Sequence, residues 1–580
     1  DYLRQLESGQ QTGFAQPPTD FIPYKLRKSI IDAEGQVNRK LWEIMLHYQL
    51  VQSLKAGEVW VEHSIEHAPL SHDIQVTGAT KIAFLQRNPH LKDADQFFRD
   101  RQTIYLETLK RANRLWPELD DVSFEEGRIY LSRLQAKEEP EGTDAVRQRL
   151  VALLPRRKLS EVFREVLHWV DYLQPLREMA GSDVRLENLD QRLLALIMAE
   201  GCNIGLTNMA NATPGLTYIQ LARVASRCLD EHSLEKAIAS IINFYDRQPI
   251  ARVWGEGVWS SADGQLVPAP VKMLHARLHP RAPKGKRVIN LFTYIYDRLM
   301  PYWGRVIGTT AHESAYEIDG LLHHVADIHP THQAVDTAGY TDNVFGLASL
   351  LSIFYAPRIK DMADQRLFYL DKADTKTFEH VGPLLKEKIN THIAKSQWNN
   401  LIELTATVEQ GIAPAARVLR KLEAAGEHND LYRALREVGR LDKTVYLLSY
   451  LTDPELRRQV ERQLNKTENY NSLANVISWG NKGEMRLPDL RDQLNRASAL
   501  RLVASIIILF NAAYIQAGVR KLRESGYAIT DEQLAHIFPT LTAYINFLGE
   551  YSFHDEPALA TRINDLPVPE PQAEQLGLDL

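Results

Sequence analysis

Three acidic residues have surroundings that suit a carboxylate ligand for a metal ion. Asp263 lies in the segment Ser260-Ser-Ala-Asp-Gly-Gln265, and Asp336 follows the apolar pair Ala334-Val335. Glu468 is the next step of a period-four stripe formed by Leu456, Val460 and Leu464. Mg²⁺ prefers oxygen ligands and keeps several waters, so a few converging carboxylates suffice to hold it. Two such ions about 4 Å apart activate the nucleophile and the leaving oxygen in phosphodiester chemistry.

Each of these acids also has a purely structural interpretation. Asp263 and Gly264 form a common turn pair. Asp336 could end a strand by accepting hydrogen bonds from backbone amides. Glu468 could lie in the first turn of a helix capped by Thr467, where the helix dipole favours it. If the helix is instead continuous, Glu468 shares the direction of three apolar side chains, and a buried carboxylate is costly unless it is paired or metal-bound.

Three other acids compete for these roles. Asp342 follows Thr341 at the start of a predicted helix, so an N-terminal capping role is the simpler interpretation and metal ligation the alternative. Glu484, in Gly483-Glu-Met-Arg486, is the second candidate for the third carboxylate. Asp319 lies in a helical pattern between Ile318 and Leu321, and we expect it to be a surface or pairing residue.

A group of histidines near Asp336 raises the possibility of a zinc site. None has a ligand spacing such as His-Glu-x-x-His, and His329-Pro-Thr-His332 is predicted to be a loop. We therefore expect phosphate or DNA contacts rather than zinc ligation from the group, which comprises His312, His323, His324, His329 and His332.

A basic segment lies between Lys272 and Arg305, where eight Lys and Arg residues accompany a single acid, Asp297. Its densest part is a loop broken by Pro and Gly, which suits either a solvated surface or a phosphate backbone. The net charge of −6 argues mildly against nucleic acid as a partner. The neighbouring aromatic residues could stack on bases, but most are spaced by two and are predicted to face the core: Phe292, Tyr294, Tyr296, Tyr302 and Trp303.

The elements that must position the acids follow from hydropathy periodicity. Helical patterns cover 25–56, 84–115, 159–173 and 189–199, with a short strand at 59–62 and a hairpin at 122–134. From residue 250 the predicted order is three strands, a helix at 313–324, a strand at 333–336 and a helix at 343–355. Three antiparallel strands followed by a crossover to a parallel fourth are typical of a ribonuclease-H-like core. After residue 358 the pattern is almost entirely helical.

Length and composition limit the class of protein. The chain has 580 residues, 44% of them hydrophobic and 24% charged, which is ordinary globular usage and excludes collagen or a disordered chain. Two cysteines, Cys202 and Cys228, cannot form a disulfide framework, so we expect a reducing cytoplasm. The most apolar run, 502–515, is predicted to be a buried helix that is too short to span a bilayer. The chain begins at Asp1 rather than Met, which suggests a piece of a longer protein.

Several of these segments resemble motifs of the Tn3 family of replicative DNA transposases. Trp254-Gly-Glu-Gly-Val-Trp-Ser-Ser-Ala-Asp-Gly-Gln265 is similar to the family's first-aspartate motif, with Ala262 in place of the usual serine. Val335-Asp-Thr-Ala-Gly-Tyr-Thr-Asp-Asn-Val-Phe345 resembles the second, and Leu464-Asn-Lys-Thr-Glu-Asn469 the third-carboxylate segment. Other similar stretches are Gly57–Glu62, Ala199–Leu206 and Tyr355–Asp361, so the resemblance covers about Pro17 to Phe553.

The resemblance implies a specific chemistry. Asp263, Asp336 and Glu468 would form a DDE triad that holds two Mg²⁺ ions, for which Mn²⁺ may substitute. The reaction would be cleavage at the 3′ ends of a transposon and strand transfer into target DNA, with a cointegrate product and a homodimer that bridges two terminal inverted repeats. Phosphate contacts are expected from Lys284, Lys286, Arg287 and Arg358. A bacterial cytoplasmic, nucleoid-associated protein with no membrane partner is expected.

Two alternatives stay open at this point. A metal-dependent nuclease on the same fold would cut DNA without joining it, and a DNA-binding remnant would have lost activity by truncation. The resemblance also implies that this chain is the C-terminal portion of a longer protein.

The predicted fold is therefore mainly α-helical, with an α/β ribonuclease-H-like core built on a mixed five-stranded sheet and a helical insertion before the third carboxylate. The predicted division is a terminal linker (1–22), a helical DNA-binding or linking domain with short strands (23–135), a helical linking domain (136–248), the first part of the core (249–360), a helical insertion (361–453), the completion of the core with C-terminal helices (454–553) and a disordered tail (554–580).

Overall fold

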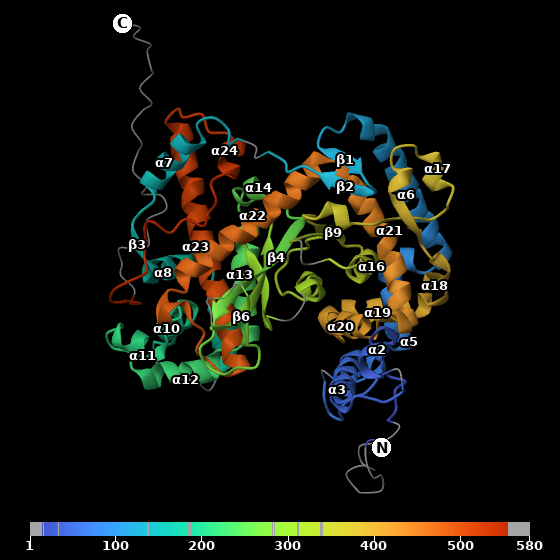
Figure 1. Ribbon diagram of the computed structural model, residues 1–580. Helices are drawn as coiled ribbons and strands as arrows, with labels where there is room; N and C mark the ends of the chain where they lie inside the picture. The colour runs from blue at the N-terminus through green and yellow to red at the C-terminus, as the bar shows by residue number, and fades with distance from the viewer. Residues whose placement is uncertain are drawn as a thin grey trace.

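The computed structural model describes residues 14, 17–32, 34–65, 67–135, 138–181, 188–280, 282, 285–309, 313–336 and 340–554. These residues form a mainly helical protein with small mixed sheets, as predicted. Figure 1 shows helices on both sides of a central sheet, with α7–α13 and α23 on one side and α6 and α16–α21 on the other. The predicted tail lies outside the described residues except for His554.

The central sheet has six strands: β4 (Trp259–Pro268), β5 (Arg277–Leu278), β6 (Arg287–Tyr296), β7 (Pro301–Ile307), β8 (His332–Val335) and β9 (Phe354–Pro357). β4, β6 and β7 are antiparallel neighbours, and β8 pairs with β4 in parallel. Both features are as predicted. β4 occupies one side of β6, so β7 and the two-residue β5 share its other side, and β9 adds a parallel strand beside β8.

Three local predictions are wrong. The helix predicted at 343–355 ends at Leu350, because Ser352 adopts a left-handed conformation (φ 58°) and the chain then pairs with β8 as β9. The helix predicted at 313–324 is instead a 3₁₀ turn (Glu313–Tyr316) followed by a four-residue helix, α15 (Asp319–Leu322), whose Asp319 accepts a hydrogen bond from the backbone of α20 (Ala415–Ala425). The strand predicted at 59–62 is a loop, since it has no neighbouring strand and Trp60 is 59% exposed.

The first half of the chain is otherwise helical, and the hairpin of β1 (Val122–Glu125) and β2 (Arg128–Leu131) is as predicted. Its helices are α2 (Tyr24–Ile30), α3 (Arg39–Ala56), α4 (Leu70–Asp73), α5 (Gly78–Arg87), α6 (Ala94–Leu115), α7 (Thr143–Leu153), α8 (Leu159–Trp169), α9 (Gln174–Ala180), α10 (Leu189–Gly201), α11 (Leu206–Asn211), α12 (Tyr218–Cys228), α13 (Glu231–Asp246) and α14 (Ala251–Trp254).

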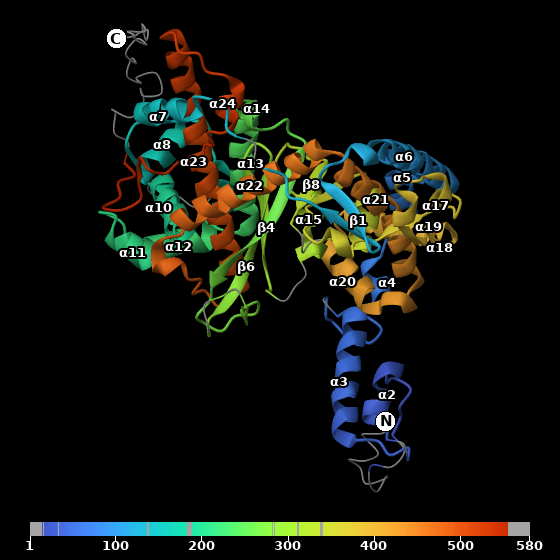
Figure 2. The ribbon, with the colours of Figure 1, turned by 45° about the horizontal axis from the view of Figure 1, so that its top comes forward.

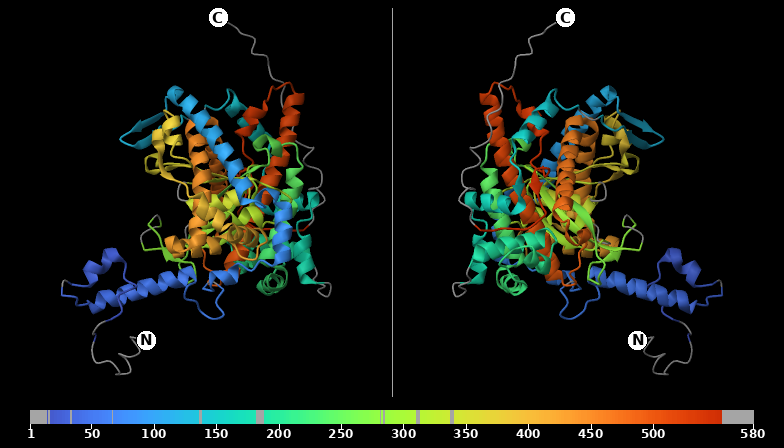
Figure 3. Two further views of the ribbon diagram at one scale, coloured as in Figure 1. Left: turned by 90° about the vertical axis from the view of Figure 1, so that its right-hand side faces the viewer. Right: turned by 90° about the vertical axis from the view of Figure 1, so that its left-hand side faces the viewer.

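The N-terminal helices α2 and α3 project from the body as an arm (Figures 2 and 3). The described end of the predicted terminal linker packs on this arm, because the Nε1–H of Trp42 donates to the carbonyl of Pro18 at 2.7 Å and Ile22 is buried.

The second half contains α16 (Asp342–Leu350), α17 (Asp374–Thr377), α18 (Thr391–Ser396), α19 (Trp398–Glu409), α20 (Ala415–Ala425), α21 (Asp430–Thr452), α22 (Pro454–Ile477), α23 (Leu490–Glu524) and α24 (Asp531–Ala535). It is not entirely helical, since short strands are present at β10 (Leu367–Tyr369), β11 (Leu385–Lys388) and β12 (Ile545–Asn546), the last paired with β3 (Arg157–Lys158).

Two helices hold the core together. α23 has 35 residues, more than the sequence pattern suggests, and by length and composition it could cross a membrane. However, 89% of its most apolar window is buried inside the protein, so the predicted core helix is confirmed. α22 packs on β4, β6 and β8 and joins two hydrophobic clusters, with Leu464 in one and Tyr470 in the other. The segment between them, which contains Glu468, therefore lies against the middle of the sheet.

Candidate active site

Asp263 lies in the middle of β4, opposite Thr293 of β6, so the interpretation as part of a turn is wrong. Gly264 is required by close packing rather than by a turn. A Cβ placed on it would collide with the side chains of Asn290 and Glu313. The short residue thus lets a second polar layer approach the strand directly beside Asp263.

Asp336 follows the last residue of β8, at the carboxyl end of the strand as predicted. The parallel register pairs Ser261 with Ala334, an offset of 73 residues. The same register continued by two residues places Asp336 level with Asp263. Side chains alternate along a strand, so both acids belong to the face that carries Ser261 and Ala334.

The carboxylate of Asp336 is held by two cations. Its Oδ1 accepts hydrogen bonds from Nε (3.1 Å) and Nη2 (2.9 Å) of Arg358, and Nζ of Lys360 lies 3.5 Å away. The β8–β9 register pairs Val335 with Pro357, so Arg358 is the next cross-strand neighbour of Asp336. Arg358, expected to contact phosphate, therefore pairs with a candidate metal ligand in the absence of DNA.

Glu468 lies in the interior of α22, so the alternative of a new helix capped by Thr467 is wrong. The side chain is nevertheless exposed, contrary to the expectation that it shares the buried direction of Leu456, Val460 and Leu464. A helix turns by about 100° per residue, so each period-four step drifts by about 40° and Glu468 points about 120° away from Leu456. The Glu468 carboxylate is therefore not subject to the free-energy cost of burying a charge.

Polar contacts fix the register of α22 on β4. Ser261 bonds to the hydroxyl of Thr467 and to the backbone carbonyl of Gln463, whose own Nε2 donates to Ser261 Oγ at 3.0 Å. One strand pair further on, Asn471 Nδ2 donates to Asp263 Oδ2 at 3.0 Å. Two residues further along β4, Gln265 Nε2 donates a hydrogen bond to Asn475 Oδ1 at 2.7 Å. Alternate strand residues therefore meet every fourth helix residue, which brings the turn with Glu468 to Asp263.

The electrostatics of the site show that the charges of several carboxylates act on one another. Burial raises the pKa of Asp263 to about 6, and the charges of Glu313, Asp336 and Glu468 add to this shift, against a hydrogen bond from the Gly264 amide. Burial also raises the pKa of Glu317 well above its ordinary value, with further contributions from Glu313 and Asp263. A cation bound among these groups would relieve their mutual repulsion.

The donor set suits Mg²⁺, since it consists of carboxylates and amide oxygens. However, among the residues that the structure describes, no three His, Cys, Asp or Glu side chains are grouped closely enough to hold a metal ion. One of the three candidate ligands, Asp336, is paired with Arg358 and Lys360.

The competing acids have other partners. Asp342 pairs with Lys443 Nζ at 2.9 Å, in the first turn of α16, which Thr341 caps as predicted. Glu484 pairs with Arg486 and with Lys286, and the carboxylates whose charges chiefly raise the pKa of Asp263 are Glu313, Asp336 and Glu468. Asp319 is buried rather than on the surface. It accepts hydrogen bonds from the backbone N–H groups of Ala415 (2.6 Å) and Ala416 (3.3 Å), and so caps α20.

The structure describes most, but not all, of the basic residues and histidines for which DNA or phosphate contacts were predicted. Lys284 and His312 lie outside the described residues, Arg287 is exposed at the start of β6, and Lys286 pairs with Glu484. Three of the other histidines have separate partners or surroundings. His323 Nε2 lies 2.8 Å from the Val408 carbonyl, and the His332 ring contacts Trp259 and Phe354. Burial lowers the pKa of His324 to about 4. Phe292, Tyr294, Tyr296 and Tyr302 are buried in the core as predicted.

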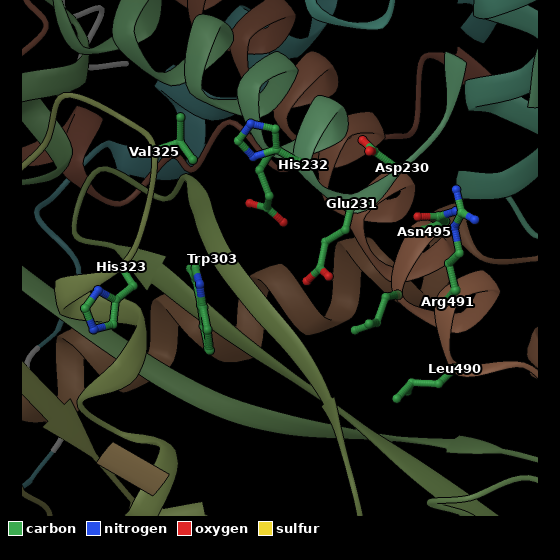
Figure 4. A pocket seen from close by; sticks show the side chains of 11 residues that line it. Asp230, Glu231, His232, Trp303, His323, Val325, Leu490, Arg491 and Asn495 are labelled. Carbon is green, nitrogen blue, oxygen red and sulfur yellow. The ribbon is translucent and has the colours of Figure 1, made fainter. Parts of the chain in front are cut away.

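A cavity of about 670 Å³ lies elsewhere, between α13, α23 and β7 (Figure 4). Its acids are already engaged: Asp230 caps α13 through the Ser233 amide, Glu231 accepts from Arg305, and Glu235 pairs with Arg501. None of the three candidate carboxylates lines it, so it is separate from the site on β4.

Some residues of the site escape the sequence patterns, namely Asn471, Glu313, Glu317 and Lys360. Asn471 is three residues after Glu468, and this spacing on one helix face is the available signal for it. Glu313 and Glu317 lie in a segment whose predicted helix does not form as such, so no pattern relates them to β4.

Known proteins are similar to this chain over most of its length. Residues 161–551 match the family model described as Tn3 transposase DDE domain. The transposase for transposon Tn1546 from Enterococcus faecium is 32% identical over 558 residues, which cover 95% of this chain and 55% of the relative. The transposase for transposon Tn501 from Pseudomonas aeruginosa is 32% identical, covering 93% and 54%. The transposase for transposon Tn21 from Escherichia coli is 30% identical with the same coverage. The chain spans about half the length of the curated relatives it matches.

Proposed function

The chain belongs to the Tn3 transposase family, and from this premise we propose that it is the catalytic portion of a DNA transposase that cleaves transposon 3′ ends and joins them to target DNA. The observation that carries the proposal is the position of three acids: Asp263 and Asp336 are level on neighbouring parallel strands, and the charge of Glu468 acts on Asp263 from the covering helix. A ribonuclease-H-like core is part of the proposal. The strand order β7-β6-β4-β8-β9, with only β6 antiparallel to its two neighbours, supports it.

In this proposal Asp263, Asp336 and Glu468 hold two Mg²⁺ ions, or Mn²⁺ in their place. Bound there, the metal would supply activation of the attacking oxygen and stabilisation of the leaving oxygen. The protein's own contribution is to position the carboxylates: the sheet fixes Asp263, and the polar contacts of α22 fix the turn that carries Glu468. Asp336 becomes available when Arg358 and Lys360 release it.

The same release provides phosphate ligands. Arg358 and Lys360 carry two positive charges at the edge of the site, and the phosphates of double-stranded DNA would compete with Asp336 for them. Lys284, Lys286 and Arg287 would add further phosphate contacts. The proposal also includes a homodimer that bridges two terminal inverted repeats, a cointegrate product and action at the bacterial nucleoid. These three parts rest on family membership alone.

The test is a strand-joining assay. It uses the full chain, Mg²⁺ or Mn²⁺, a supercoiled target and a duplex that carries the terminal repeat of the encoding element with a free 3′-hydroxyl. Joined product with the wild type, and none with Asp263→Ala, is the expected result. A target that is only nicked would favour a metal-dependent nuclease, and a duplex that is bound without any reaction would indicate a DNA-binding remnant.

A further inference from the structure

The carboxylate of Asp263 is held from two directions. Its Oδ1 accepts the backbone N–H of Gly264 at 2.8 Å, and its Oδ2 accepts Nδ2 of Asn471 at 3.0 Å. An ionised carboxylate is only an acceptor, so the NH₂ group of Asn471 must face it and the amide oxygen must point elsewhere. That oxygen, Asn471 Oδ1, is buried and has no hydrogen-bond partner in the structure.

An unpaired buried carbonyl oxygen needs an explanation, since buried polar atoms are normally hydrogen-bonded. Asn471 is also three residues after Glu468, and residues with this spacing are neighbours on a helix surface. One turn of α22 therefore carries both the third candidate carboxylate and the amide that contacts the first. The contacts of Ser261 with Gln463 and Thr467 hold this turn in register with β4.

We propose that Asn471 is a positioning residue of the metal site. Its NH₂ group holds the orientation of Asp263, and its amide oxygen accepts a hydrogen bond from metal-associated water. Mg²⁺ keeps several waters when proteins bind it, and such water is a donor that a buried amide oxygen can use. This proposal rests on the proposed function, because it assumes that Asp263 is a metal ligand.

Mn²⁺ binding to the full chain tests it without a need for catalysis. The loss of the free Mn²⁺ signal in electron paramagnetic resonance gives the affinity for the wild type, Asp263→Ala, Asn471→Ala and Asn475→Ala. Asn475 is the matched control, since it lies one turn further along α22 and bonds to Gln265 rather than to Asp263. Outer-shell partners of metal ligands contribute roughly 10–100-fold to affinity, so Asn471→Ala should weaken binding by about that factor and Asn475→Ala should not.

The outcomes separate the two proposals. If Asp263→Ala leaves Mn²⁺ binding intact, the metal site is wrong and the role of Asn471 falls with it. If Asp263→Ala removes binding but Asn471→Ala matches Asn475→Ala, the metal site stands and the positioning role is refuted. Urea unfolding of each variant identifies any global loss of structure. Should Asn471→Ala fail to fold, Asn471→Ser, whose hydroxyl is too short to reach Asp263, gives the same comparison.

Discussion

A single added methyl group beside Asp263 should disrupt the site without changing any of its ligands. In Gly264→Ala the new Cβ would collide with the side chains of Asn290 and Glu313. Asn290 is 3% exposed and donates to Glu313 Oε1 at 2.6 Å, so neither group can move freely. Overpacking of this kind costs about 1–3 kcal/mol of unfolding free energy.

Gly308 offers a matched control. It directly follows β7, and a Cβ there would meet nothing closer than Nδ1 of His275 at 3.7 Å, an ordinary contact. A Gly→Ala change at a compatible position stabilises a protein by about 0.4–1 kcal/mol. The free energies of unfolding of the two variants, measured with urea, should therefore differ by about 1.4–4 kcal/mol.

Gly264→Ala should also slow strand joining, because the added methyl group would displace groups next to Asp263. Misplacement of a reacting group by about 1 Å can reduce the rate 10²-fold, so Gly264→Ala should join strands far more slowly than Gly308→Ala under saturating metal. Equal unfolding curves and equal joining rates for the two variants would refute the close packing around Asp263.

Further predictions concern the charges of the site and its supports. Asp263→Asn should lose Mn²⁺ binding and, at pH 7, should unfold at a higher urea concentration than the wild type. Because the pKa of Asp263 is raised, the folded wild type binds more protons than the unfolded chain between about pH 4 and 6, and its metal-free stability falls as the pH rises through this window. The variant has no carboxyl group at this position and should not lose stability in this way. Mn²⁺ affinity of the wild type should fall as pH drops below about 6, because the protonated carboxyl no longer binds metal, and a flat pH profile would argue against Asp263 as a ligand. Arg358→Ala should raise Mn²⁺ affinity in the absence of DNA, since it removes a competitor for Asp336, and should weaken DNA binding in a filter assay; unchanged values for both would contradict the proposed exchange. Asp319→Ala should lower unfolding free energy by about 1–2 kcal/mol, because it removes the cap of α20, and calorimetry or urea unfolding measures it.

The sequence predicts the part of the site that depends on local pattern. Alternating hydrophobicity identifies β4 and β6, and the apolar pair before Asp336 identifies β8, so the two aspartates are found from the chain alone. The pattern leaves open whether the helix of Leu456, Val460 and Leu464 continues through Glu468, and the structure shows that it does. It gives the wrong orientation for Glu468, because a period-four stripe drifts around a helix whose period is 3.6.

What escapes prediction depends on tertiary contacts. Ser352 adopts a positive φ, which a serine in the sequence does not predict. The sequence therefore predicts neither the strand β9 nor the cross-strand pairing of Asp336 with Arg358. Asp319 is buried because α20 presents its unpaired amides to it, although the two are 96 residues apart. Asn471 is recognisable only once the register of α22 on β4 is known, since amide side chains are common on exposed helix faces.

The most direct test of the central claim is the strand-joining assay applied to four single variants, with duplex binding measured in parallel. Asp263→Ala, Asp336→Ala and Glu468→Ala should each bind the transposon-end duplex and yield no joined product. Glu484→Ala should join strands like the wild type, because Glu484 pairs with Arg486 and Lys286 instead of acting on Asp263. Joined product from Glu468→Ala, or its loss in Glu484→Ala, would contradict the assignment of the third carboxylate and with it the proposed site.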